Sequence, residues 1–310
     1  MLTSELYKYF KESSSVSTDT RLIKKGSIFF ALKGENFDGN KFAEEAINNG
    51  ASYAIIDDHS LNNPKFIKVK NALKSLQDLS KFHRSKLSKT KIIALTGSNG
   101  KTTTKELISE VLKKKYRIIS TIGNLNNHIG VPLTLLRIKS DTEIAIVEMG
   151  ANHLNEIKFL TELINPDFGL ITNFGKAHLE GFGSEEGVLQ GKTELYDFIA
   201  KKDGIIFINQ DDNKLLNSIG DVTHTSYKPS EFRTTQDQPT LKLVCQNIEI
   251  PTQLVGTYNK ENIAAAVSIG AYFGVSLLKA AKAICDYSPN NSRSQLMTLN
   301  GKTLTFDAYN

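Results

Sequence analysis

The sequence predicts an α/β protein with two domains: a small N-terminal α/β domain and a larger domain with a mostly parallel sheet flanked by helices. From residue 91 onward, short continuous apolar runs alternate with helical patterns, which is typical of parallel strands buried on both faces. The chain also has 310 residues, more than one ordinary core contains. Two domains are therefore expected.

The first domain is expected to span residues 1–87. Apolar runs that end in turn signals predict its strands, and apolar residues at helical spacing predict its helices. A polar stretch at 85–90 is the expected linker to the second domain. The predicted elements are strands at 27–32 and 53–56 and helices at 42–47 and 72–86.

The second domain, residues 88–310, is expected to hold the parallel sheet. In such sheets the ligand lies beyond the carboxyl ends of the strands, so polar residues that directly follow a strand are the first candidates for chemistry. Residues 223–247 are polar and irregular and predict a β-rich excursion. The remaining predictions are strands at 92–96, 144–147, 169–172 and 204–208 and helices at 102–115 and 264–273.

Composition and charge exclude several classes of protein. Lys+Arg number 38 against 33 Asp+Glu, a net charge of +5 that gives no reason to expect a nucleic-acid partner. Cys245 and Cys285 are the only cysteines, too few for a disulfide framework. The N-terminus lacks a signal-peptide core, and no apolar run reaches the ~20 residues that a membrane span needs. We expect a cytoplasmic monomer.

The strongest local signal is Thr-Gly-Ser-Asn-Gly-Lys-Thr-Thr at residues 96–103. It follows a buried strand and opens a helix, the setting of a phosphate-binding loop, although Leu95 stands where the common pattern has its first glycine. Main-chain N–H groups and the helix N-terminus would bind phosphate, Lys101 would neutralise the β- and γ-phosphates, and Thr102 would bind Mg²⁺. The ATP-binding residues expected here are Gly97, Ser98, Asn99, Gly100, Lys101, Thr102 and Thr103.

Two further polar side chains follow neighbouring strands. Glu148 ends the run 144–147, where its carboxylate can reach a Mg²⁺ ion above the adjacent phosphate loop. His178 follows the strand that ends near Thr172, at the same edge, which suggests a metal or phosphate role. Lys192, by composition alone, is an ordinary solvated helix lysine.

At this point the chain resembles the ATP-dependent Mur ligases of bacterial cell-wall synthesis. The phosphate loop has their form, which explains the missing glycine. The stretch Gly-Asn-Leu-Asn-Asn-His-Ile-Gly-Val-Pro-Leu-Thr resembles the branch that adds D-alanyl-D-alanine, and the early motifs look like the family's uridine-nucleotide domain. The motifs that carry the resemblance are residues 19–21, 29–34, 38–39, 96–103, 123–134, 148–151 and 173–182.

The resemblance implies a role for each matching residue. Lys101 and His178 would be catalytic, together with Lys192, which matches the lysine that these ligases carry as a carbamate. Two Mg²⁺ ions are expected, held by Thr102, Glu148, His178 and the carbamylated Lys192. Tyr258 stands where many relatives have histidine, which leaves Asn259 as the better adenine-side residue. The other implied contacts are Asn262, Arg293 and Asp307 for ATP, and Thr20, Arg21, Asn126 and Asn127 for the muramoyl-peptide substrate.

The implied reaction joins D-alanyl-D-alanine to UDP-MurNAc-tripeptide through an acyl phosphate. Family members continue into a third domain, so we expect a two-domain fragment that lacks the C-terminal ligase domain and ligates weakly or not at all. Three alternatives stay open: another amide ligase (the one that adds the third residue, or a folate polyglutamate ligase), a non-catalytic nucleotide-binding or scaffold protein, and a plain P-loop NTPase.

Overall fold

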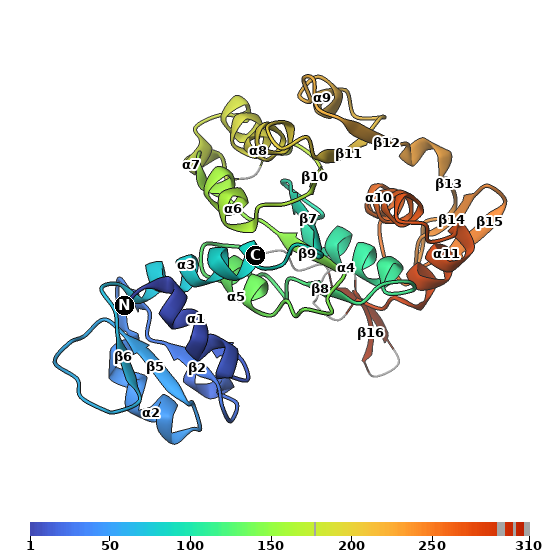
Figure 1. The fold of residues 1–310 in the computed structure, drawn as a ribbon. Coiled ribbons are helices and arrows are strands. Elements are labelled where there is room, and N and C mark those ends of the chain that lie inside the picture. The colour runs from blue at the N-terminus through green and yellow to red at the C-terminus, as the bar shows by residue number, and fades with distance from the viewer. Residues whose placement is uncertain (177, 290–294, 300–301, 307–310) are drawn as a thin grey trace. The chain divides into compact units, whose positions relative to one another are not determined.

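The computed structural model describes residues 1–176, 178–289, 295–299 and 302–306 (Figure 1). The chain forms two compact units. The first contains Met1–Lys89, Leu125–Ser140 and Leu163–Asn165, and the second contains Thr90–Asn124, Asp141–Glu162 and the residues from Pro166 onward. The segment Leu125–Ser140 thus packs with the first unit, whereas the expected boundary near residue 88 had assigned it to the second domain.

The first unit is built on a parallel sheet with the strand order β1-β2-β5-β6. Side chains of β2 alternate between its two faces: Ile28 and Phe30 pack into one apolar cluster and Phe29 into another. Because both faces are covered, the strands read as unbroken apolar runs. The strands are β1 Val16–Ser17, β2 Ile28–Phe30, β5 Tyr53–Ile56 and β6 Phe66–Lys68.

Helices cover both faces of this sheet (Figure 1). Leu6 of α1 and Leu76 and Leu79 of α3 pack with Ile28 and Phe30, while the short α2 packs against the opposite face. Asn71 begins α3 because its side chain accepts the Lys74 N–H at 2.7 Å. The remaining elements are α1 Thr3–Glu12, η1 Thr20–Leu22, β3 Lys33–Gly34, β4 Phe37–Asp38, η2 Gly39–Phe42, α2 Ala43–Asn48, α3 Ala72–Ser85 and α5 Gly130–Leu136.

The second unit contains a six-stranded sheet with the order β12-β11-β10-β7-β9-β8, in which every pairing is parallel. The order reverses at β7, the first strand of this unit, and such a point is where open α/β sheets bind ligands. The strands are β7 Lys91–Thr96, β8 Ile118–Ser120, β9 Ile144–Glu148, β10 Phe168–Ile171, β11 Ile205–Asn209 and β12 His224–Tyr227.

Both faces of the six-stranded sheet are covered by helices (Figure 1). On one face α4 Lys101–Leu112, α10 Asn259–Tyr272 and α11 Leu277–Asp286 share one apolar cluster with the sheet. On the other face α8 Glu185–Ala200 packs so closely on Gly169 of β10 that a Cβ there would lie 3.2 Å from Ile199. The other elements are α6 Glu156–Ile164, α7 Leu179–Phe182, α9 Asn213–Leu216, η3 Pro229–Glu231, β13 Arg233–Gln236, β14 Lys242–Cys245, β15 Ile248–Pro251, β16 Gln295–Leu299 and β17 Lys302–Phe306.

The parallel register brings three strand ends to one edge of this sheet. Leu95 of β7 pairs with Glu148 of β9, and Thr96 pairs with Ile171 of β10. The loop after Thr96, the carboxylate of Glu148 and the segment after Ile171 therefore meet at the carboxyl edge. Among the described residues, no helix combines the length and apolar character needed to span a bilayer.

The α/β fold class is confirmed, and each predicted strand is present within one or two residues of its expected bounds. Several details differ. Lys33–Gly34 pairs with Phe37–Asp38 as a strand rather than forming a simple turn. The short β8 was not anticipated. The β-rich excursion expected at residues 223–247 is confirmed by β12, β13 and β14, but the membership of β12 in the main sheet was not expected. The helix predicted at 264–273 begins earlier, at Asn259, and the one predicted at 102–115 runs from Lys101 to Leu112.

Candidate functional site

Two glycines shape the loop between β7 and α4. Gly97 has a φ of 148° and Gly100 a φ of 77°, values that side chains disfavour. A Cβ at Gly97 would lie 1.9 Å from Thr172 Oγ1, and one at Gly100 would lie 2.5 Å from Asn262 Oδ1. Space and backbone conformation thus both require glycine, and the chain turns sharply into the first turn of α4.

The loop is clamped by the segment that follows β10. Thr172 Oγ1 donates to Asn99 O at 2.6 Å, and the Asn99 N–H donates to Asn173 Oδ1 at 3.0 Å. The Ser98 N–H donates to Asn173 O at 3.1 Å. The amides of Ser98 and Asn99 are therefore used to fix the loop, so phosphate contacts by main-chain N–H groups are expected from the first turn of α4 instead. Direct contacts of these two residues with ATP remain predictions.

Lys101 places its ammonium group over the loop. Its Nζ donates to Gly97 O at 2.7 Å and to Ser98 O at 3.0 Å. The positive charge thus lies at the N-terminus of α4, whose aligned peptide dipoles already favour an anion. Together, the helix end and the lysine form an electropositive corner suited to a polyphosphate.

Thr102 and Glu148 meet beside this corner. Thr102 Oγ1 donates to Glu148 Oε1 at 3.1 Å, and their exposed fractions are 2% and 1%. The Glu148 N–H donates to Thr121 Oγ1 at 3.0 Å, which holds the end of β9 in place. A hydroxyl and a carboxylate are hard oxygen donors, so this pair fits Mg²⁺. In the part of the chain that the structure describes, no three or more His, Cys, Asp or Glu side chains are grouped so that they could hold a metal ion by themselves.

A buried lysine beside Glu148 was missed by the sequence analysis. Lys105 is 1% exposed, and its Nζ lies 3.8 Å from Glu148 Oε2. The same Nζ donates to Gly123 O at 3.2 Å. Its position one helical turn after Lys101 is a signal that could have placed it on the same face of α4.

Lys192 is not the solvated lysine that its composition suggested. It lies on α8 with 2% exposure, and its Nζ is 5.7 Å from the centre of the Phe182 ring. Burial, followed by the positive charge of Lys101, lowers the pKa of Lys192 to about 7. A substantial fraction of this amine is therefore neutral near pH 7, as carbamate formation requires.

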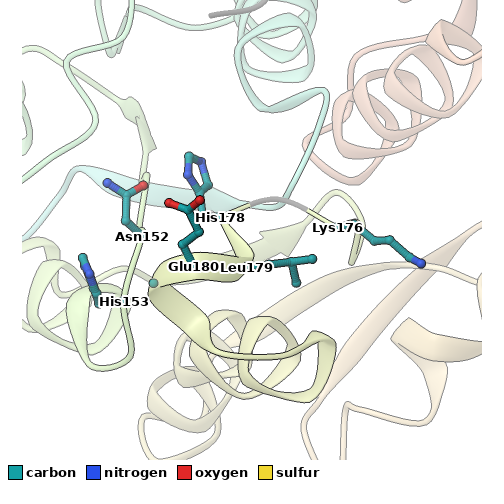
Figure 2. A pocket seen from close by; sticks show the side chains of 7 residues that line it. Asn152, His153, Lys176, His178, Leu179 and Glu180 are labelled. Atoms are coloured by element: carbon teal, nitrogen blue, oxygen red, sulfur yellow. The ribbon is translucent and has the colours of Figure 1, made fainter.

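His178 lies at a pocket of about 560 Å³ on the second unit (Figure 2). Figure 2 shows His178, Glu180 and Asn152 directed toward the same side of the pocket, while Lys176 extends away from them and pairs with Glu185 at 3.1 Å. His178 has a φ of 57°, an uncommon conformation for a side-chain-bearing residue that is frequently found at functional sites. Burial lowers its pKa, with Lys101 and Lys192 acting in the same direction. The charges of Lys101 and Lys192 therefore both act on the His178 ring.

The expected adenine-side residues lie behind the loop. Asn262 is buried, accepts from Thr104 Oγ1 at 2.9 Å, and donates through Nδ2 to Asn259 Oδ1 at 2.9 Å. Asn259 is fully buried, and Tyr258 beside it is 54% exposed. The two asparagines thus support Gly100 and α4, and their contact with nucleotide remains a prediction. Arg293 and Asp307 lie outside the described residues.

The expected muramoyl-peptide residues all belong to the first unit. Thr20 and Arg21 lie in η1, and the Arg21 guanidinium pairs with Asp19 at 2.6 Å. Asn127 begins the turn before α5, where its Oδ1 accepts from the Gly130 N–H at 2.9 Å. Asn126 precedes it in the same loop. Their roles toward a substrate remain predictions.

Two family models match long stretches of the chain. A family model described as "Mur ligase middle domain" matches residues 95–270, and one described as "Mur ligase family, catalytic domain" matches residues 12–87. The chain belongs to the Mur ligase family. A relative from Bacillus subtilis, named UDP-N-acetylmuramoyl-tripeptide–D-alanyl-D-alanine ligase, is 38% identical over 309 residues. The match covers 95% of this Mur ligase chain and 66% of that relative, so the chain spans a little less than two thirds of the relative's length.

Solved Mur ligase structures resemble the chain over nearly its whole length. MurF from Acinetobacter baumannii has a TM-score of 0.83 and 27% identity, covering 99% of this chain and 73% of that one. MurF from Thermotoga maritima, solved in complex with ADP, has a TM-score of 0.79 and 25% identity, covering 97% of this chain and 72% of that one. The α/β architecture of the chain is therefore that of the part of these MurF structures that it matches.

Proposed function

We propose that this chain carries the nucleotide-binding and muramoyl-peptide-binding parts of a ligase that adds D-alanyl-D-alanine to UDP-MurNAc-tripeptide in peptidoglycan precursor synthesis. The proposal is supported by the B. subtilis relative, whose name states this activity and which is 38% identical over 95% of the chain. In this proposal the second unit binds ATP, the first unit, which includes Asn126 and Asn127, binds the UDP-MurNAc-tripeptide, and the protein acts as a cytoplasmic monomer.

The observation that carries the nucleotide assignment is the contact of Thr102 with Glu148 beside the glycine loop, at 3.1 Å. Thr102, Glu148, His178 and a carbamate on Lys192 would hold two Mg²⁺ ions. When bound, these ions would offset the negative charge of the triphosphate. The low pKa of Lys192, about 7, supports the carbamate because only a neutral amine traps CO₂.

The proposed reaction has two steps. In the first step the tripeptide carboxylate attacks the γ-phosphorus of ATP, and the bond between this phosphorus and the oxygen that bridges it to the β-phosphate breaks. ADP departs, and an acyl phosphate is formed. The amine of D-alanyl-D-alanine then attacks the carbonyl carbon and loses a proton, while the bond from carbon to the phosphate oxygen breaks. The difficulty is the approach of two anions in the first step. The ammonium of Lys101, held over the loop by Gly97 O and Ser98 O, offsets that charge where it develops.

The remaining contacts follow the family resemblance. Asn259 and Asn262 would act at the adenine side, and Thr20 and Arg21 at the uridine nucleotide. Arg293 would approach the nucleotide, and Asp307 would accept a hydrogen bond from its ribose. Asn126 and Asn127 would position the muramoyl peptide. That the T. maritima MurF structure was solved in complex with ADP supports adenine-nucleotide binding.

Isothermal titration calorimetry tests the proposal with a non-hydrolysable ATP analogue, with and without Mg²⁺, and with UDP-MurNAc-tripeptide. Binding of both ligands is expected, and binding of neither would indicate a scaffold protein. For the activity itself, a ligase that contains this sequence is offered D-alanyl-D-alanine, lysine or diaminopimelate in parallel. Consumption of ATP with an amine other than D-alanyl-D-alanine would assign the chain to a different Mur ligase.

A further inference from the structure

A third lysine at the carboxyl edge has no part in the proposed reaction. Lys105 follows Lys101 by one turn of α4 and is 1% exposed. Lysine is among the residue types least often fully buried unless its charge is paired. A lysine in this position, within one helical turn of the phosphate loop, therefore needs an explanation beyond packing.

The contacts of Lys105 converge on the proposed Mg²⁺ site. Its Nζ lies 3.8 Å from Glu148 Oε2 and 3.8 Å from Glu106 Oε1, and it donates to Gly123 O at 3.2 Å. Glu106 also accepts a hydrogen bond from Tyr287 Oη, and its side chain is 22% exposed. Glu148 is the partner of Lys105 that is as deeply buried as the lysine itself, with 1% exposure.

The two oxygens of the Glu148 carboxylate thus face two residues of one helix. Thr102 donates to Oε1 at 3.1 Å, and Lys105 approaches Oε2 at 3.8 Å. Thr102 and Lys105 are three positions apart, so they lie on the same face of α4. Contacts to both oxygens fix the rotation of the Glu148 carboxylate about its Cγ–Cδ bond. Both contacts come from α4, the helix that begins at the phosphate loop.

We propose that Lys105 is a positioning residue for the Mg²⁺ site: it holds the Glu148 carboxylate, directed at Thr102, in the orientation that metal binding requires. The inference rests on the proposed function because Glu148 is proposed there as a Mg²⁺ ligand. Groups that orient a metal ligand commonly matter almost as much as the ligand itself. The link from Lys105 to Gly123 O also ties the end of β9 to the segment that follows β8.

The test measures how strongly Mg²⁺ improves nucleotide binding. Calorimetry with a non-hydrolysable ATP analogue gives one Kd in EDTA and one in saturating Mg²⁺, and their ratio is the readout. For Lys105→Met we expect this ratio to fall by ~10–100-fold, while the Kd in EDTA stays within about threefold of wild type. An unchanged Kd in EDTA shows that the phosphate loop is intact. A variant that merely damaged the structure would change the Kd in EDTA as well.

A double-mutant cycle identifies Glu148 as the residue through which Lys105 acts. Glu148→Gln alone should lower the Mg²⁺ ratio, and adding Lys105→Met to it should lower the ratio no further. Full additivity of the two losses would overturn the proposal. Lys113→Met, at the exposed C-terminus of the same helix, serves as the control and should match wild type.

Two further outcomes are informative. If Lys105→Met does not fold, Lys105→Gln carries the same comparison, because it keeps a donor for Gly123 O and removes the charge. If Mg²⁺ improves nucleotide binding equally in the wild type and in the Lys105 variant, this inference is overturned and the proposed function stands. A wild-type protein whose nucleotide affinity ignores Mg²⁺ overturns the proposed function, and this inference with it.

Discussion

The buried amine of Lys192 should make the stability of the protein depend on pH. Its pKa in the folded protein is about 7, lowered from 10.5 by burial and then by Lys101. Between these two values the unfolded chain binds one more proton at this position than the folded chain does. The free energy of unfolding therefore rises with pH in this window, by up to about 1.4 kcal/mol per pH unit. Below pH 7 the folded protein bears the full cost of a buried charge.

Lys192→Met removes this contribution. Because half of the folded molecules are already deprotonated at pH 7, the wild type should gain about 2 kcal/mol relative to Lys192→Met between pH 7 and pH 9. Urea unfolding in CO₂-depleted buffer, followed by far-UV circular dichroism, measures this difference. Lys201→Met, which alters an exposed lysine just beyond the end of the same helix, is the control and should show no such trend.

Bicarbonate provides the chemical half of the same test. The neutral amine and CO₂ form a carbamate and release a proton, so added bicarbonate should stabilise the wild type and leave Lys192→Met unchanged. A difference between wild type and Lys192→Met that stays flat within about 0.5 kcal/mol from pH 7 to pH 9 would refute the low pKa. Equal stabilisation of both proteins by bicarbonate would refute carbamate formation.

Three other predictions concern the loop and the metal pair. In a ligase that contains this sequence, Lys101→Ala should lower kcat/KM by ~100-fold or more, because an ammonium that offsets developing charge is lost; steady-state kinetics with near-normal values would contradict its role. Glu148→Gln should weaken nucleotide binding in Mg²⁺ but not in EDTA, as calorimetry can determine. Gly100→Ala and Gly183→Ala share nearly the same backbone strain, with φ of 77° and 79°, but only Gly100 has a close neighbour, Asn262 Oδ1 at 2.5 Å. Urea unfolding should show a loss of about 1–2 kcal/mol for Gly183→Ala and about 1–3 kcal/mol more for Gly100→Ala; equal losses would show that the contact is relieved at no cost.

The sequence predicted the parts of the fold that depend on local pattern. The apolar run at 92–96 and the glycines that follow it identify a strand, a loop and a helix start, because each signal lies within a few residues. The placement of Glu148 next to Thr102 could also be predicted, since a parallel sheet brings strand ends to one edge. Local sequence pattern was thus sufficient to predict those contacts that follow directly from the parallel arrangement of the strands.

Contacts between distant segments could not be predicted in the same way. The burial of Lys192 depends on Phe182 and α7, which close over α8 at Gly187 and Gly191, and composition shows none of this. Likewise, nothing in the pattern of residues 125–140 indicates that they pack with the first unit, because their apolar residues would suit either core. Lys105 was overlooked because a lysine on a helix is usually solvated.

The clamp on the phosphate loop has a consequence for the order of assembly. Its hydrogen bonds join positions 74 and 77 residues apart along the chain, from Asn99 to Asn173 and from Ser98 to Gly175. Contacts so distant in sequence form later than a helix or a single turn does. A nascent chain synthesised only as far as residue 150 would therefore contain all residues of the phosphate loop, 96–103. It would lack the partners at 173 and 175 that hold this loop in its final conformation. Nucleotide capture should consequently report completion of the central sheet, and not the mere presence of the motif.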